Sequence, residues 1–179
     1  MEEAEAQKQA EIEEAERVRS ETEARLAAEA EEQARIEEEQ RQAALAELAP
    51  KKENEKAFAH FEKCVNGDAA SCSKLGWIYI WGQDAAKDKV KAMSLFSLAC
   101  DRDFVDGCIY LGRMYVGGGF EGGFGDLQGI PKNTEKALSL FSQECDVGHA
   151  AACVELGYMY DMGNGVIEDK AKAVSLFNR

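Results

Sequence analysis

The chain has 179 residues, of which 45% are hydrophobic, so it is long enough to form one ordinary domain plus an additional segment. Its 21 basic and 34 acidic residues give a formal charge of −13, which argues against a nucleic-acid backbone or an anionic lipid surface as the main partner. No apolar run approaches the length of a membrane span, and the glutamate-rich start differs from a secretory leader, so we expect neither feature in these residues.

Residues 1–49 are predicted to form a long charged helix. They contain 16 glutamates and 6 lysines or arginines, which is −10 of the total charge, and no glycine or proline, a composition typical of a solvated helix. Glutamates precede arginines by four positions, an order that stabilises a helix by roughly 0.2–0.5 kcal/mol per pair. Four such pairs are Glu13/Arg17, Glu21/Arg25, Glu31/Arg35 and Glu37/Arg41.

The same segment has no regular apolar seam. Its larger apolar residues stand 6, 8, 10, 9 and 3 positions apart, so no heptad is sustained: Ile12, Val18, Leu26, Ile36, Leu45 and Leu48. We interpret residues 1–49 as a spacer arm, on the order of 70 Å long if fully helical. A weak alanine-lined coiled coil and a disordered segment are the alternatives, and any oligomerisation through this arm is expected to be weak.

A repeat follows the short linker at residues 50–53. The motif Lys-Ala-x-Ser-Leu-Phe occurs three times, with a looser copy before them: Lys91–Phe96, Lys136–Phe141, Lys172–Phe177 and Lys56–Phe61. A second motif, Leu-Gly-x-x-Tyr, alternates with it: Leu75–Tyr79, Leu111–Tyr115 and Leu156–Tyr160. Both motifs place apolar residues at i, i+3 and i+4, so each repeat is predicted to be a pair of helices.

Glycines punctuate the repeat in two ways. The glycines that follow the first helices are predicted to terminate these helices: Gly82, Gly117 and Gly163. A loop insertion is predicted at Val116–Pro131. The glycines inside the first helices are predicted to be packing contacts: Gly76, Gly112 and Gly157 opposite Ala92, Ala137 and Ala173. The aromatic residues of the motifs are predicted to be core: Tyr79, Tyr115, Tyr160, Phe61, Phe96, Phe141 and Phe177.

The run from Leu156 to Phe177 closely resembles the Sel1-like repeat, a relative of the tetratricopeptide repeat, because Leu-Gly-x-x-Tyr, Gly-x-Gly-Val, Asp, Lys-Ala and Phe recur in order. The resemblance covers residues 54–179, with partial first and last copies. It implies an all-α fold, a right-handed α-solenoid of helix pairs that follows the long N-terminal charged helix. It also implies a scaffold that binds a protein or peptide on a concave face.

Six cysteines form three pairs, each eight residues apart: Cys64/Cys72, Cys100/Cys108 and Cys145/Cys153. Each pair runs from the end of one second helix into the next first helix, where two antiparallel helices can bring the Cα atoms within disulfide range. Such pairs are similar to those of the cysteine-rich Sel1-like proteins of Helicobacter and relatives, which implies disulfides and an oxidising compartment, secreted or periplasmic. Reduced buried thiols in a cytoplasmic protein and, more remotely, zinc ligation are the alternatives.

Two further motifs are candidates for chemistry. Cys145, His149 and Cys153 share a spacing that one helical face could align around a metal, but Gly148 is predicted to break that helix. Ser71 and Lys74 match the Ser-x-x-Lys signature of penicillin-recognising enzymes, and some cysteine-rich Sel1-like proteins are labelled β-lactamases. The partner motifs Ser-Asp-Asn and Lys-Thr-Gly do not occur in the sequence. We therefore expect no catalytic residues, no metal site and no cofactor, with β-lactam binding as a remote alternative.

Positions that vary among the copies are the candidates for binding a partner. On the first helices they include Lys74, Trp77, Trp81, Tyr110, Arg113, Glu155 and Tyr158, a set rich in the residue types that anchor interfaces. The alternative for Trp77 and Trp81 is that they only cover the first repeat. The alternative function is that of a structural protein, in which the long helix mediates assembly and the repeats anchor it.

The last second helix is short by comparison with its copies, since Arg179 aligns with Gln143. We expect a longer array, in which a cysteine follows two positions beyond Arg179 and another eight later. Val174 and Phe177 should then be exposed in this chain.

Overall fold

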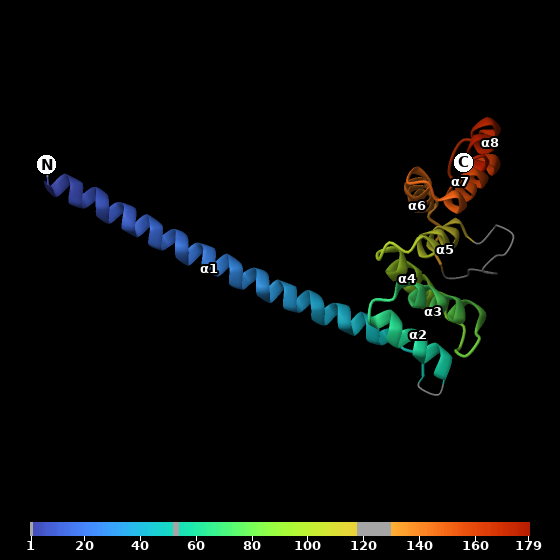
Figure 1. Cartoon of the computed structure of the whole chain (residues 1–179), viewed down its shortest axis with the longest axis horizontal. Coiled ribbons are helices and arrows are strands. Elements are labelled where there is room, and N and C mark those ends of the chain that lie inside the picture. The colour runs from blue at the N-terminus through green and yellow to red at the C-terminus, as the bar shows by residue number, and fades with distance from the viewer. Residues whose placement is uncertain (1, 52–53, 118–129) are drawn as a thin grey trace. The chain divides into compact units, whose positions relative to one another are not determined.

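The computed structural model describes residues 2–51, 54–117 and 130–179. Every regular element in these ranges is an α-helix, eight in all. The chain divides into two units, Met1–Glu47 and Leu48–Arg179, which are described separately. The predicted all-α fold, a long charged helix and a solenoid of helix pairs, is confirmed (Figure 1).

Helix α1 (Glu2–Glu47) is a single uninterrupted helix. Every residue from Glu13 to Ala44 is exposed, including the apolar side chains of Val18, Leu26 and Ile36. A helix without a buried face depends on the propensity of its residues and on contacts between neighbouring side chains.

The arginines of α1 do not form the predicted pairs with glutamates four residues before them. Among its described side chains, Arg17, Arg35 and Arg41 contact glutamates three residues before them, at 2.6–2.8 Å. Arg19 and Arg25 contact glutamates four residues after them. An arginine on so acidic a helix has several glutamates within reach, so sequence order alone does not select its partner.

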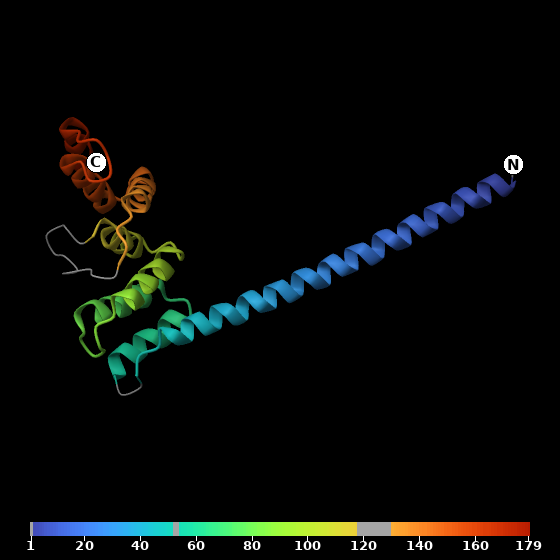
Figure 2. The same ribbon diagram turned by 180° about the vertical axis from the view of Figure 1, so that it is seen from behind.

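The described residues of the repeat unit form seven helices, each packed against the next (Figure 2). Their bounds are α2 (Glu55–Val65), α3 (Ala69–Trp81), α4 (Lys89–Cys100), α5 (Val105–Val116), α6 (Thr134–Asp146), α7 (Ala150–Met162) and α8 (Lys170–Phe177). The first helices end at glycines with positive φ, as predicted: Gly82, Gly117 and Gly163. The predicted loop insertion falls mainly on residues 118–129, outside the described part of the chain.

A tyrosine near the end of each first helix is tied to the start of the following second helix. Its carbonyl accepts a backbone hydrogen bond of 2.8–3.0 Å from the N-cap residue: Asp88 to Tyr79, Asn133 to Tyr115 and Asp169 to Tyr160. The N-cap side chain accepts from the backbone N–H of the lysine three residues later, at 2.9 Å in each copy. The ammonium group of that lysine lies over the tyrosine ring. These contacts explain why Tyr, Asp or Asn, and Lys recur in this order.

The glycine inside each first helix lies under an aromatic ring of the second helix. A Cβ atom added to it would lie 2.5–2.8 Å from that ring: Phe96 for Gly76, Phe141 for Gly112 and Phe177 for Gly157. The atoms nearest to these glycines are not those of the predicted Ala92, Ala137 and Ala173 but those of the phenylalanine four residues farther along the same helix. These glycines leave room for a ring where no Cβ would fit.

The predicted core aromatic residues differ in burial. Phe96 and Phe141 are fully buried and Tyr79 is 4% exposed. Phe61, Tyr115 and Tyr160 are only half-buried, and Phe177 is 39% exposed, so the core prediction was too broad. Val174 and Phe177 are both exposed, as expected for the last helix.

The six cysteines lie in the three nearest-neighbour pairs, as disulfides. The Cα atoms of each pair are 4.5–4.6 Å apart, and each bond joins the end of a second helix to the next first helix. The same geometry recurs three times because the same turn separates the two helices in each copy. Each junction from one helix pair to the next is therefore closed covalently.

Candidate interaction surface

The first helices form a row within the repeat unit. In addition to its neighbours in the chain, α3 contacts α5, and α5 contacts α7. All seven residues predicted to bind a partner lie on these three helices. The structure thus places positions that are up to 84 residues apart, from Lys74 to Tyr158, on one row of helices.

The seven candidates differ in how much surface they offer. Lys74, Trp81 and Tyr158 are exposed, with Trp81 at 49% and Tyr158 at 39%. Trp77, Tyr110 and Arg113 are half-buried. Met162 occupies the position of Trp81 in the third repeat, belongs to the same set of variable positions and is 60% exposed.

Trp77 and Trp81 pack with the core instead of standing alone on the surface. Their rings are stacked, with centroids 6.1 Å apart. Trp77 also meets Phe96 and Tyr110 edge-on, with centroids 5.9 and 4.8 Å apart. Trp77 and Tyr110 thereby link the first repeat to the second, while Trp81 at the outer edge keeps half of its surface available.

Glu155 was predicted to face a partner, and this was wrong because the residue is buried, at 3% exposure. Its Oε1 accepts hydrogen bonds from the guanidinium of Arg113, including one of 2.9 Å from Nε. This ion pair joins α5 to α7. Within the described part of the chain, Oε2 of Glu155 has no hydrogen-bond partner. Arg113 is half-buried and committed to this pair, so the two residues serve mainly the packing of neighbouring repeats.

Ser71, the candidate nucleophile, is 2% exposed. Its hydroxyl donates to Asp68, the N-cap residue of α3, and this hydrogen bond holds the pKa of the Asp68 carboxyl below its usual value. Nδ1 of His60 lies 3.5 Å from the same hydroxyl, beyond a normal hydrogen bond of this kind. A buried hydroxyl that already donates to a carboxylate is suited to stabilising the start of α3 and is poorly placed for attack on a β-lactam.

The candidate metal ligands have other roles in the structure. Cys145 and Cys153 form a disulfide, and His149 is the N-cap residue of α7. Among the residues that the structure describes, no group of three His, Cys, Asp or Glu side chains is arranged to hold a metal ion.

Comparison with protein families identifies the repeat. The Sel1 repeat matches residues 69–104, 105–149 and 150–179, which together make up more than half of the chain. The chain belongs to the Sel1 repeat family. With these boundaries, the Cys100–Cys108 and Cys145–Cys153 bonds each join one Sel1 repeat to the next, and Cys64–Cys72 joins α2 to the first.

Several solved structures are similar to this chain, including the following two. The first is c5321, a protective antigen of uropathogenic Escherichia coli strains that displays an SLR fold, with 29% identity and a TM-score of 0.58. The match covers 68% of this chain but only 24% of that protein. The second, a Sel1 repeat protein from Oxalobacter formigenes, has 21% identity and a TM-score of 0.52 over 67% of this chain and 84% of that one, which shows the fold alone. Comparison with curated proteins gave no match.

Membership of the family carries a general function. Sel1 repeat proteins generally act as scaffolds that bind other proteins, and they are generally not enzymes. The three disulfides indicate an oxidising compartment. Within the described ranges, none of the helices is both long and apolar enough to cross a membrane.

Proposed function

We propose that the Sel1 repeats bind a protein or peptide on the surface formed by α3, α5 and α7. The observation that carries this proposal is that large apolar side chains at variable positions of these helices stay exposed. They are Trp81, Tyr158 and Met162. Aromatic residues and methionine are enriched where protein interfaces form.

The contrast with the invariant positions supports this assignment. The leucines of the Leu-Gly-x-x-Tyr motif are at most 6% exposed in all three repeats: Leu75, Leu111 and Leu156. Their constancy follows from packing. The exposed positions keep part of their surface outside the core, so the repeats present different groups, an indole in the first repeat and a phenol and a thioether in the third. Such a row suits a segment whose apolar side chains are spaced along its length.

Selection of displayed peptides tests the proposal. Random peptides on phage are selected against the full-length oxidised chain, and binding of the selected sequences is measured for Trp81→Ala and Tyr158→Ala. We expect each variant to weaken binding by about tenfold or more, as for truncation of an interface anchor. Val90→Ala is the matched control, because Val90 is 63% exposed but lies on α4, a second helix. Failure to select any binder, or equal loss in the control, would contradict the proposal.

We further infer that the protein acts outside the cytoplasm, as a secreted or periplasmic protein, with no nucleic acid and no direct membrane contact. The disulfides support this location because thiols are kept reduced in most cytosols. Peptide mapping of protein isolated from its native compartment, without reduction, should recover the three pairs. Three or more free thiols would contradict the location.

For the N-terminal unit we propose the role of a spacer. The observation in favour is that α1 is exposed on all sides from Glu13 to Ala44, without an apolar stripe for a second helix. Sedimentation of the full-length chain at micromolar concentration should show a monomer. A stable dimer that disappears when residues 1–47 are removed would show instead that α1 mediates assembly.

A further inference from the structure

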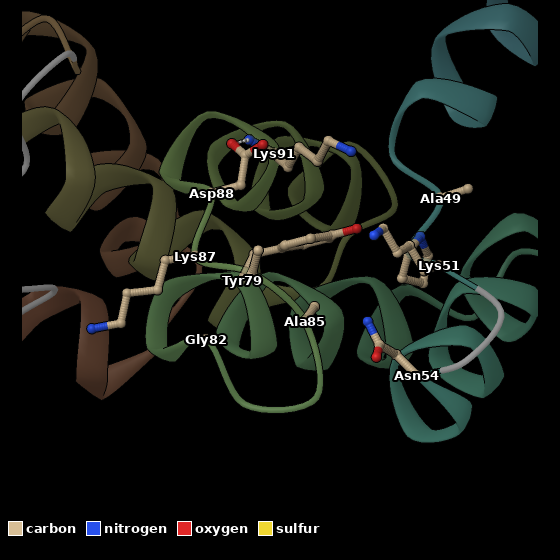
Figure 3. Close-up of a pocket in the computed structure, with 11 residues that line it drawn as sticks. Ala49, Lys51, Asn54, Tyr79, Gly82, Ala85, Lys87, Asp88 and Lys91 are labelled. Atoms are coloured by element: carbon tan, nitrogen blue, oxygen red, sulfur yellow. Dashed lines mark hydrogen bonds between the residues drawn. The ribbon is translucent and has the colours of Figure 1, made fainter.

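A cavity of about 530 Å³ lies at the start of the repeat unit (Figure 3). One wall is formed by Ala49, Pro50, Lys51 and Asn54, which precede α2, and the other by the loop between α3 and α4, with Tyr79 between them. The volume falls in the range of pockets that bind small molecules. Nothing in the function proposed above uses this cavity.

Hydrogen bonds to Tyr79 hold both walls in place. Its hydroxyl donates to the carbonyl of Leu48 at 2.9 Å, which fixes the segment entering α2. Its backbone carbonyl accepts from the N–H of Asp88 at 3.0 Å, which fixes the other wall. The ring itself is 4% exposed. A buried residue therefore anchors the two chain segments that form the walls of the cavity.

The hydrogen-bond donors of the cavity gather on one side. Figure 3 shows the amino group of Lys91, the side chain of Lys51 and the amide of Asn54 on the side toward which the Tyr79 hydroxyl points, whereas Lys87 extends away. The carboxylate of Asp88 already accepts a hydrogen bond from the backbone N–H of Lys91. Both lysines line the cavity, and within the described residues neither forms an ion pair with a carboxylate.

The third repeat differs from the first in how its lysine contacts the tyrosine. There Lys172 donates to the hydroxyl of Tyr160 at 2.7 Å, and its ammonium lies 4.0 Å from the ring centroid. In the first repeat the hydroxyl of Tyr79 is turned to Leu48, and the Lys91 ammonium lies 5.5 Å from the ring centroid. Lys91 therefore keeps its donors available for a ligand.

We propose that this cavity binds a small organic oxyanion, a carboxylate or phosphate ester. The anionic group is held between Lys51 and Lys91, with Asn54 as an additional donor. The carbon skeleton lies against the methyl groups of Ala49 and Ala85. The two ammonium groups supply charge, and the apolar walls select anions with an organic part over bare inorganic ions.

Nuclear magnetic resonance titration of the full-length oxidised chain tests the proposal. Benzoate and phenyl phosphate are the two anionic probes, and benzamide is a neutral probe of nearly the same shape. We expect saturable shifts of the amides of residues 82–88 with the anions and none with benzamide. The affinity should fall as sodium chloride is raised from about 50 to 300 mM, because screening weakens the contact of the ligand with the lysines. The relative affinities of the two anions distinguish a carboxylate site from a phosphate site.

Substitutions locate the binding. Lys51→Gln and Lys91→Gln should each weaken it by about fivefold, a typical value for one exposed ion pair. Lys136→Gln is the matched control, since Lys136 occupies the position of Lys91 in the next repeat, over Tyr115. Lys51 lies outside every helix, so its variant should fold even if that of Lys91 does not. The proposal is overturned by equal binding of benzamide, by equal loss in the control, or by no saturable shift at about 10 mM probe, the limit of weak specific binding.

Discussion

Helix α1 and the helices of the Sel1 repeats contrast in what surrounds them. From Glu13 to Ala44, no residue of α1 is buried, and its ion pairs lie at the surface. In the repeats, each helix buries residues such as Phe96 and Phe141 completely, and a disulfide closes each junction. Residues of α1 stabilise only their neighbours in sequence, whereas residues of the repeats stabilise partners in other helices. We therefore expect the two units to respond differently to the same kind of change.

Reduction of the disulfides should have the largest effect, and only on the repeats. Each bond closes a short loop, and loop-closure entropy assigns roughly 2–3 kcal/mol to each, so reduction should lower the unfolding free energy of the repeat unit by on the order of 6 kcal/mol. Denaturation followed by circular dichroism, with and without reductant, measures this. The part of the helical signal that belongs to α1 should be unchanged. Loss of all helicity in one step would contradict the contrast between the units.

Alanine at the helix crossings should have the next largest effect. In a solvated helix Gly→Ala stabilises by about 0.5–1 kcal/mol. At Gly112 the added methyl group would meet the fully buried ring of Phe141, so Gly112→Ala should destabilise by about 1–3 kcal/mol. Gly157→Ala is the matched variant, because the ring of Phe177 is 39% exposed and can move aside. Chemical denaturation measures both, and equal losses would show that burial of the ring is not what decides the cost.

A smaller effect should appear when the pH is lowered, through His60. Burial, followed by the charges of Lys74 and Lys63, lowers the pKa of His60 below its usual value. A histidine with a lower pKa in the folded state binds protons more readily when unfolded, so its contribution to stability is complete above the unfolded pKa and is lost as the pH falls through the folded pKa.

Thermal unfolding between about pH 7.5 and pH 5 measures this loss, across the usual pKa of histidine near 6.5. His60→Gln should reduce the pH dependence of the melting temperature. His149→Gln, at the exposed second histidine of the chain, is the comparison variant, and an equal reduction there would show that the dependence does not come from His60. A wild-type melting temperature that does not fall on acidification would contradict the assignment.

The repeat period predicted most of the fold, because each copy repeats the same contacts. One recurring motif consists of Tyr79, Asp88 and Lys91 and their equivalents. The structure explains the recurrence, because these residues form the hydrogen bonds and the ring contact that join the end of one helix to the start of the next. The surface was less predictable. From the sequence, Glu155 is predicted to be an exposed charge, because its partner Arg113 lies 42 residues away in the chain. The cavity at Tyr79 depends on the path of the chain near Leu48, which lies outside the repeats and has no counterpart in their pattern.

The smallest effect is expected where an ion pair of α1 is removed. Arg41 donates to both carboxylate oxygens of Glu38 at 2.8 Å, but both side chains are at least half exposed. Arg41→Gln should therefore cost no more than about 0.5 kcal/mol, and added salt should weaken the wild-type contact similarly. Amide exchange within α1 measures the change locally.

The same substitution in the repeats is the matched comparison. Arg113→Gln removes the partner of a buried carboxylate, and the unfolding free energy should fall by about 1–3 kcal/mol, because Glu155 would be left without its main donor. Both substitutions remove one guanidinium, so the difference between them compares an exposed pair within one helix with a pair that joins two helices at a buried carboxylate. If Arg41→Gln proved as costly as Arg113→Gln, α1 would have to bury part of its surface against a partner, and its interpretation as a solvated spacer would fail.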